Sequence, residues 1–155
     1  MQTFLPYKSF KESLKSLDWR RLGKQRVEAY QILNVLLGRT TTKGWINHPI
    51  TKMWAGYENA LKQYLNECID EWVGRGYNNN MEYEVIDGDI KYPHWLGNDL
   101  FHSSHRANLL RKDSEFYSKY MWTEDCTNPY CWYDTDKKEW YLQNVGTGIR
   151  EYING

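Results

Sequence analysis

The stretch from Asp18 to Gly38, DWRRLGKQRVEAYQILNVLLG, constrains the fold more than any other part of the chain. Its apolar residues recur at spacings of three, four and seven, which is typical of a helix that packs one face against a core. Asp18 suits the N-cap position because its carboxylate can accept the free N–H groups of a first helical turn. Gly38 suits the position after the last turn because it adopts a left-handed backbone without steric cost. We therefore predict one long helix between these two residues.

A second face of this predicted helix is polar and charged. At positions i, i+3, i+4 and i+7 it carries Arg21, Lys24, Gln25 and Glu28. The face has two interpretations: a solvated surface with ion pairs along the helix, or a catalytic carboxylate at the edge of a basic groove. Gly23 favours the second, since a glycine inside a helix costs about 1 kcal/mol relative to alanine and usually permits a close approach.

The rest of the chain shows further helical patterns. Residues 9–17 read as a short helix, and apolar residues repeat at threes and fours over 49–73 and again over 103–120. Residues 81–86 alternate weakly, as a strand does, and the last dozen residues read as loose. We predict a mostly α fold: a compact single domain over residues 1–155, with three main helices, long loops and a small C-terminal β-hairpin at residues 131–142.

The distribution of charge points to an anionic partner. Formal charges cancel over the 155 residues, but residues 1–62 hold eleven Lys/Arg and four Asp/Glu, whereas the remainder holds nine and sixteen. Such asymmetry suggests an anionic partner for the basic part. The eight Trp and thirteen Tyr suit either core packing or stacking on nucleobases.

Several classes of protein are not indicated by the sequence. No apolar run has the length of a signal peptide or a membrane span, and three cysteines do not form an even disulfide set. Cys126 and Cys131 lack a second pair of ligands at zinc spacing. We expect a cytoplasmic monomer without membrane contact, with no cofactor and no metal site.

Basic residues from two predicted helices define a candidate groove. If these helices pack side by side, their cations can neutralise phosphates without reading sequence. Glu28 would then be a rare carboxylate in a cationic site, able to stabilise an oxocarbenium-like charge at C1′ of a deoxyribose or to activate a nucleophile. His102 and His105 are either structural residues near a helix start or titratable site residues. The candidate groove cations are Arg20, Arg21, Lys24, Arg26, Arg106, Arg111 and Lys112.

Three blocks, in this order along the chain, carry a resemblance to a known family. They are RLGKQRVEAYQIL at 21–33, the stretch HPITKMWAGYENALKQYLNECIDEWVGRGY at 48–77, and WLGNDLFHSSHRANLLRKDSEFY at 95–117. They resemble, respectively, the glutamate-bearing helix, the long central helix and a DNA-backbone-binding helix of the pyrimidine-dimer DNA glycosylase/AP lyase family, the endonuclease V type of phage repair enzyme. In detail, the three blocks are similar to a bacterial and phage branch of this family. The resemblance covers residues 1–122 and leaves 123–155 as a C-terminal extension.

The resemblance implies DNA repair by base excision. It implies an enzyme that kinks double-stranded DNA, flips a nucleotide out and cleaves the N-glycosidic bond of a damaged or modified pyrimidine. Glu28 matches the essential glutamate, with Arg26 beside it as a second catalytic residue. The residues that we expect to contact DNA are Arg21, Lys24, Gln25, His48, His102, His105, Arg106, Arg111 and Lys112.

The resemblance also implies an AP-lyase step, in which the α-amine of the chain's first residue forms a Schiff base with C1′. Because the long side chain of Gln2 is expected to hinder removal of the initiator methionine, we assign this amine to Met1. Water activated by Glu28 is the alternative nucleophile.

Two other functions agree with the same residues. One is a non-catalytic DNA-binding protein that uses the same basic groove, and the other is an enzyme of free or modified nucleotides. The C-terminal extension has a separate interpretation, as a cap over the base pocket that changes the substrate.

Overall fold

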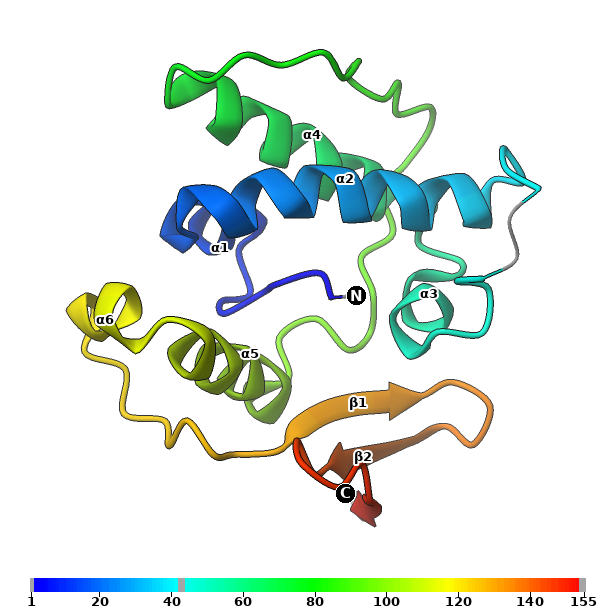
Figure 1. Cartoon of the computed structure of the whole chain (residues 1–155). Coiled ribbons are helices and arrows are strands. Elements are labelled where there is room, and N and C mark those ends of the chain that lie inside the picture. The colour runs from blue at the N-terminus through cyan, green and yellow to red at the C-terminus, as the bar shows by residue number, and fades with distance from the viewer. Residues whose placement is uncertain (1, 42–43, 154–155) are drawn as a thin grey trace.

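Six α-helices and a three-stranded antiparallel sheet form the computed structural model, which describes residues 2–41 and 44–153 (Figure 1). The helices are α1 (Phe10–Ser16), α2 (Trp19–Leu36), α3 (Pro49–Trp54), α4 (Glu58–Gly74), α5 (Asp99–Lys112) and α6 (Ser114–Tyr117), and a short 3-10 helix (Ser118–Tyr120) follows. The strands are β1 (Tyr130–Asp134), β2 (Glu139–Gln143) and β3 (Arg150–Ile153), with β2 in the middle. The predicted mostly α fold with a small C-terminal β element is confirmed.

The long helix predicted between residues 18 and 38 is α2. Gly38 has a φ of +67°, as a residue just beyond a helix end requires. Asp18 occupies the N-cap position, but its side chain caps no backbone N–H. Its carboxylate instead accepts hydrogen bonds from the Tyr117 hydroxyl and from Arg21, so it joins α2 to α6.

The other predicted boundaries need correction. The helix predicted over 49–73 is two helices, because Gly56 has a φ of +88°, which a right-handed helix does not allow. The helix predicted over 103–120 begins earlier, since the Asn98 side chain caps the N–H of Phe101 at 2.9 Å. It ends at Lys112, because Asp113 leaves the helical region with φ −155° and ψ 75°.

Two predictions for the less regular segments were also wrong. Residues 81–86 form no strand; the segment is extended and its Glu84 backbone is hydrogen-bonded to the Asn66 side chain of α4 at 2.7 and 2.9 Å. The end of the chain is not loose throughout, because residues 150–153 pair with β2 as a third strand. Residues 154 and 155 lie outside the described residues.

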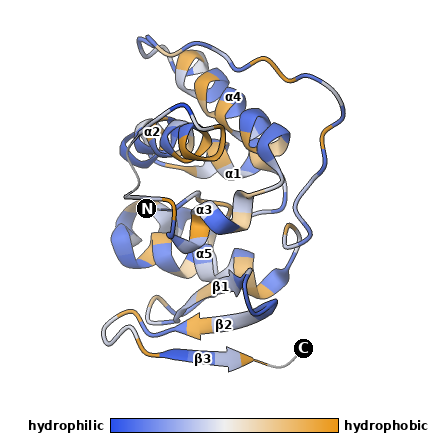
Figure 2. Cartoon of the chain, turned by 90° about the vertical axis from the view of Figure 1, so that its right-hand side faces the viewer, coloured by the Kyte–Doolittle hydropathy of each residue, from blue (hydrophilic) through white to orange (hydrophobic). Residues whose placement is uncertain are grey.

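The N-terminal segment, residues 2–9, runs between the α2–α4 helix pair and α5 (Figure 1). Figure 1 shows it below α2 and above α5, and Figure 2 shows α4 and α2 at one end of the molecule and the sheet at the other. Trp54 of α3 is fully buried in the core and donates from Nε1 to the Thr3 hydroxyl at 3.0 Å. Gly23 lets α2 approach α4, because a Cβ at this position would lie 2.9 Å from the Trp72 ring. The close approach predicted from this glycine is therefore present.

Two buried histidines hold the N-terminal segment in place. The Leu5 N–H donates to Nδ1 of His105 at 2.8 Å, and Nδ1 of His102 lies 2.7 Å from the Leu5 carbonyl oxygen. Since an N–H can only donate, Nδ1 of His105 carries no proton and its proton is on Nε2, which has no partner among the described residues. Burial, with smaller contributions from His102 and Arg106, lowers the pKa of His105 to about 3.

This arrangement predicts a loss of stability in mild acid. The unfolded chain protonates His105 near pH 6.5 and the folded chain does not, so the free energy of unfolding is unaffected above that pH and falls below it, by about 1.4 kcal/mol per pH unit. His105→Asn keeps an acceptor for the Leu5 N–H but does not titrate. We expect urea unfolding at pH 7.5, 6 and 5 to show a shallower pH dependence in this variant, and an unchanged one in the control His94→Asn, whose ring is exposed. Equal slopes in His105→Asn and the wild type would contradict the assignment.

Candidate active site

A cavity of about 870 Å³ lies between α2, α5 and the C-terminal sheet. Its volume falls within the range of about 300–1,000 Å³ that ligand sites usually have. The walls come from the N-terminal segment, the first three turns of α2, the start of α3 and the second half of α5. Asp113 and Phe116, the N-cap and a residue of α6, and all three strands complete them. Segments from both halves of the chain therefore build one site.

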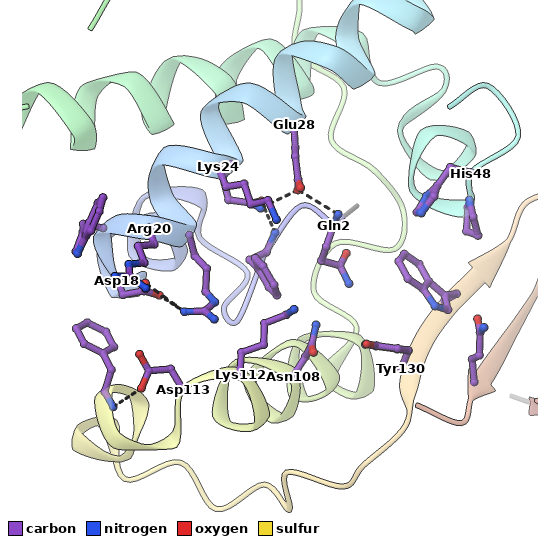
Figure 3. A pocket seen from close by; sticks show the side chains of 18 of the residues that line it. Gln2, Asp18, Arg20, Lys24, Glu28, His48, Asn108, Lys112, Asp113 and Tyr130 are labelled. Carbon is purple, nitrogen blue, oxygen red and sulfur yellow. Dashed lines mark hydrogen bonds and ion pairs between the residues drawn. The ribbon is translucent and has the colours of Figure 1, made fainter. Parts of the chain in front are cut away.

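One end of the cavity is cationic. Figure 3 shows Arg20, Lys24 and Lys112 on the same side of the site, with Asp18 nearby. Arg21 also lines this end and is paired with Asp18 at 3.2 Å, whereas Lys24 and Lys112 make no salt bridge within the described parts of the chain. We call Arg20, Arg21, Lys24 and Lys112 the cationic end.

The cations of this end repel one another. Partial removal from solvent, and then the charges of Arg21 and Lys24, lower the pKa of Lys112. An anion at this place would relieve the repulsion, and a phosphate is suited to it because it accepts hydrogen bonds from several donors at once. The cationic end can therefore hold the backbone of a nucleic acid.

Glu28 lies between the cationic end and the sheet. Its Oε2 accepts from Nε2 of Gln25 at 3.2 Å and from the backbone N–H of Gln2 at 3.3 Å (Figure 3). Gln25 is itself fixed, because its Oε1 accepts from the Phe4 N–H at 2.8 Å and from the Tyr64 hydroxyl at 2.9 Å. With its oxygen occupied, the amide of Gln25 can offer only its N–H₂ group to the carboxylate. The hydrogen bonds from Gln25 and Gln2 thus hold the Glu28 carboxylate at the cavity wall in one orientation.

The opposite end of the cavity is mainly aromatic, with the cation Arg150 of β3 at its edge. Figure 3 shows His48 and Tyr130 on this side of Glu28, and Asn108 on α5 between Lys112 and Tyr130. The ring of Trp132 lies 6.0 Å from that of His48 and 6.3 Å from that of Tyr130, measured between centroids. Gln143 of β2 and its cross-strand partner Arg150 of β3 also line this part of the cavity. We call His48, Asn108, Tyr130, Trp132 and Gln143 the aromatic end.

The structure brings together about half of the residues that the sequence nominated. Arg21, Lys24, Gln25, Glu28, His48 and Lys112 line the cavity. Met1 lies outside the described residues, so its predicted role stays a prediction. Arg26 does not line the cavity: its guanidinium stacks on Trp72 at 4.4 Å and donates to Asn79 at 2.6 Å.

The remaining nominated residues bind other parts of the protein. His102 and His105 hold Leu5, and Arg106 donates to the Pro6 carbonyl at 2.6 Å and pairs with Glu124 at 2.9 Å. Arg111 donates to the Cys126 carbonyl and to Oδ1 of Asn108, at 2.6 and 2.7 Å. These side chains therefore bind other parts of the protein and do not line the cavity.

Sequence reasoning missed the aromatic end except for His48. Asn108 lies in the middle of a predicted helix without a motif around it, Trp132 falls within the predicted hairpin, and Tyr130 lies one residue before that hairpin. The spacing of two between Tyr130 and Trp132 places both on one face of β1. That signal could identify the face, but not the cavity that the face would meet.

The model of one protein family, described as pyrimidine dimer DNA glycosylase, matches residues 1–85. The matched part contains Glu28 and helices α1 to α4, but not α5, α6 or the sheet. No curated protein and no solved structure gives a significant match to the chain. In the described part of the chain, no helix is both long and apolar enough to span a membrane, and no group of three His, Cys, Asp or Glu side chains is arranged to hold a metal ion.

Proposed function

The chain belongs to the pyrimidine dimer DNA glycosylase family, and on this premise we propose that it releases a damaged or modified pyrimidine from double-stranded DNA by cleaving the N-glycosidic bond. One observation carries the proposal: the carboxylate of Glu28 is held at the wall of a cavity with cations on one side and aromatic rings on the other. The groups of a flipped nucleotide follow a matching order: phosphates for the cations, the sugar for Glu28, and the base for the aromatic rings.

This arrangement suggests how the bond is broken. With phosphates at the cationic end and the base at the aromatic end, C1′ of the sugar lies between them, beside the Glu28 carboxylate. As the base departs with the electron pair of the N-glycosidic bond, positive charge develops on C1′ and O4′. A fixed carboxylate stabilises that charge without reorganising, which is the most effective form of electrostatic catalysis.

The N-terminal segment supplies the position for a nucleophile. The backbone nitrogen of Gln2 lies 3.3 Å from Oε2 of Glu28, and the α-amine assigned to Met1 belongs to the preceding residue. If the methionine is removed, the nitrogen of Gln2 becomes the amine. In either case the amine attacks C1′, the base leaves, and opening of the sugar ring gives an imine that allows elimination of the 3′ phosphate. Water is the alternative nucleophile, and it gives an abasic site without a covalent intermediate.

Borohydride trapping separates these routes. We expect that incubation with duplex DNA containing an abasic site and sodium borohydride gives a stable protein–DNA adduct, since reduction fixes the imine. Mass spectrometry of the digested adduct identifies Met1 or Gln2 as the linked residue. Release of a pyrimidine without any adduct would assign the step to water. Salt-sensitive binding without release of any damaged or modified pyrimidine would contradict the glycosylase proposal and favour the non-catalytic DNA-binding alternative.

A further inference from the structure

Four of the five residues of the aromatic end, all except His48, lie beyond the part of the chain that matches the family. Asn108 comes from α5, Tyr130 and Trp132 from β1, and Gln143 from β2, all after residue 85. The stacking faces of Tyr130 and Trp132 and the amide of Asn108 suit a nucleobase. What such a site accepts depends on which hydrogen-bonding atoms it presents, and two of these are fixed by their partners.

Asn108 presents a donor to the cavity. Its side chain is buried apart from the part that lines the cavity, with 3% of the residue exposed. Its Oδ1 accepts from Arg111 at 2.7 Å. A guanidinium has no acceptor, so the atom that faces Arg111 must be the amide oxygen. The N–H₂ group of Asn108 is therefore the other arm of the amide, and it makes no hydrogen bond with the described residues.

Arg111 is itself held by hydrogen bonds, and this fixes the orientation of the Asn108 amide. It donates to the carbonyl oxygens of Cys126 and Asn128, at 2.6 and 3.3 Å, and its guanidinium lies 5.2 Å from the centre of the Tyr130 ring. A rotation of the Asn108 amide by 180° would place its N–H₂ group against these fixed donors. Arg111 thus positions both Asn108 and the neighbouring aromatic ring.

His48 presents a second donor by the same logic. Its Nδ1 accepts from the N–H of Ile50 at 3.1 Å, as the N-cap of α3. The N–H can only donate, so Nδ1 is unprotonated. Burial lowers the pKa of His48 to about 4, so the ring is neutral at pH 7 and its single proton is on Nε2. Nε2 lies on the side of the ring away from the helix backbone and has no partner among the described residues.

Two fixed donors that line a base-sized site favour a base that presents an acceptor to each of them. Thymine-type and uracil-type bases carry oxygens at both C2 and C4, whereas cytosine-type bases carry an amino group at C4. We propose that Asn108 and His48 donate hydrogen bonds to the oxygens at C2 and C4 of the flipped base, so that the site accepts 2,4-dioxopyrimidines and rejects cytosine-type bases. This inference rests on the proposed function for the placement of the base. An amino group facing either donor would leave two donors opposed, a mismatch that weakens binding by about tenfold or more.

Binding to DNA that cannot be cleaved tests the inference separately from catalysis. The probes are two duplexes that carry 2′-fluoro-2′-deoxyuridine or 2′-fluoro-2′-deoxycytidine, each opposite a tetrahydrofuran abasic analogue. The fluorine stabilises the N-glycosidic bond, and the abasic partner removes the difference in base-pairing energy between the two probes. Fluorescence anisotropy at one salt concentration gives both dissociation constants. We expect the full chain to bind the uridine probe at least about tenfold more tightly.

Asn108→Asp is the variant that tests whether the amide of Asn108 acts as a hydrogen-bond donor to the base. The aspartate keeps a partner for Arg111, because a carboxylate accepts from a guanidinium at least as well as an amide does, and it replaces the N–H₂ donor by an acceptor. We expect the ratio of the two dissociation constants to fall to about one or to invert toward cytidine. Asn78→Asp, at an exposed position outside the cavity, adds the same charge and should leave the ratio unchanged.

Each outcome decides one point. Equal binding of the two probes by the wild-type chain overturns the inference, and an unchanged ratio in Asn108→Asp overturns the assignment to this residue. Preference for the uridine probe, without base release from the corresponding 2′-deoxy duplexes, would support base recognition here while refuting the proposed glycosylase chemistry.

Discussion

Glu28→Gln is expected to slow base release by about 10²–10³-fold while changing DNA affinity little. The substitution preserves the shape of the side chain, and the new Oε1 can still accept from Gln25 and from the backbone N–H of Gln2. What is lost is the negative charge at the cavity wall, and with it the stabilisation of the cationic sugar that exists only in the transition state. Single-turnover release of a labelled pyrimidine, together with anisotropy on the same duplex, measures the two quantities.

A second carboxylate controls for general effects of removing a charge. Glu82→Gln alters an exposed residue that does not line the cavity, and it should release base at the wild-type rate. Glu28→Gln releasing base as fast as Glu82→Gln would exclude Glu28 from catalysis. A parallel loss of DNA affinity in Glu28→Gln would instead indicate that the carboxylate shapes the binding surface.

The double variant Lys24→Ala/Lys112→Ala is expected to bind duplex DNA about tenfold or more weakly at low salt. Each lysine that contacts a phosphate releases about one counterion on binding, so the slope of log K against log salt concentration should become shallower by about two. These two cations make no salt bridge in the described parts of the chain and face the cavity from opposite helices. Titrations at four or five salt concentrations give the slope directly.

Lys11→Ala/Lys15→Ala is the matched control, because both lysines lie on α1 and neither lines the cavity. It removes the same charge and should leave the slope nearly unchanged. A similar change of slope in the two double variants would show that binding depends on the net charge of the chain rather than on the cationic end.

Local patterns were sufficient for the main helix and for the face that carries Glu28. Helical periodicity depends on residues three and four apart, so the stretch from Asp18 to Gly38 reports it without reference to the rest of the chain. The same stretch contained Gly23, whose cost inside a helix correctly indicated a close approach, here to Trp72. These features are short-range, and a single sequence contains what is needed to read them.

Long-range contacts decided which of the charged and titratable residues reach the cavity. His105 and Arg106 have the composition of a binding motif, yet their partners are Leu5 and Pro6, about a hundred positions earlier in the chain. Arg111, nominated for phosphate binding, fixes the amide of Asn108 instead. The aromatic end unites His48 with strand residues more than eighty positions later. Residue type and local spacing show which groups are able to donate, accept or stack, but the packing of distant segments determines what each of them meets.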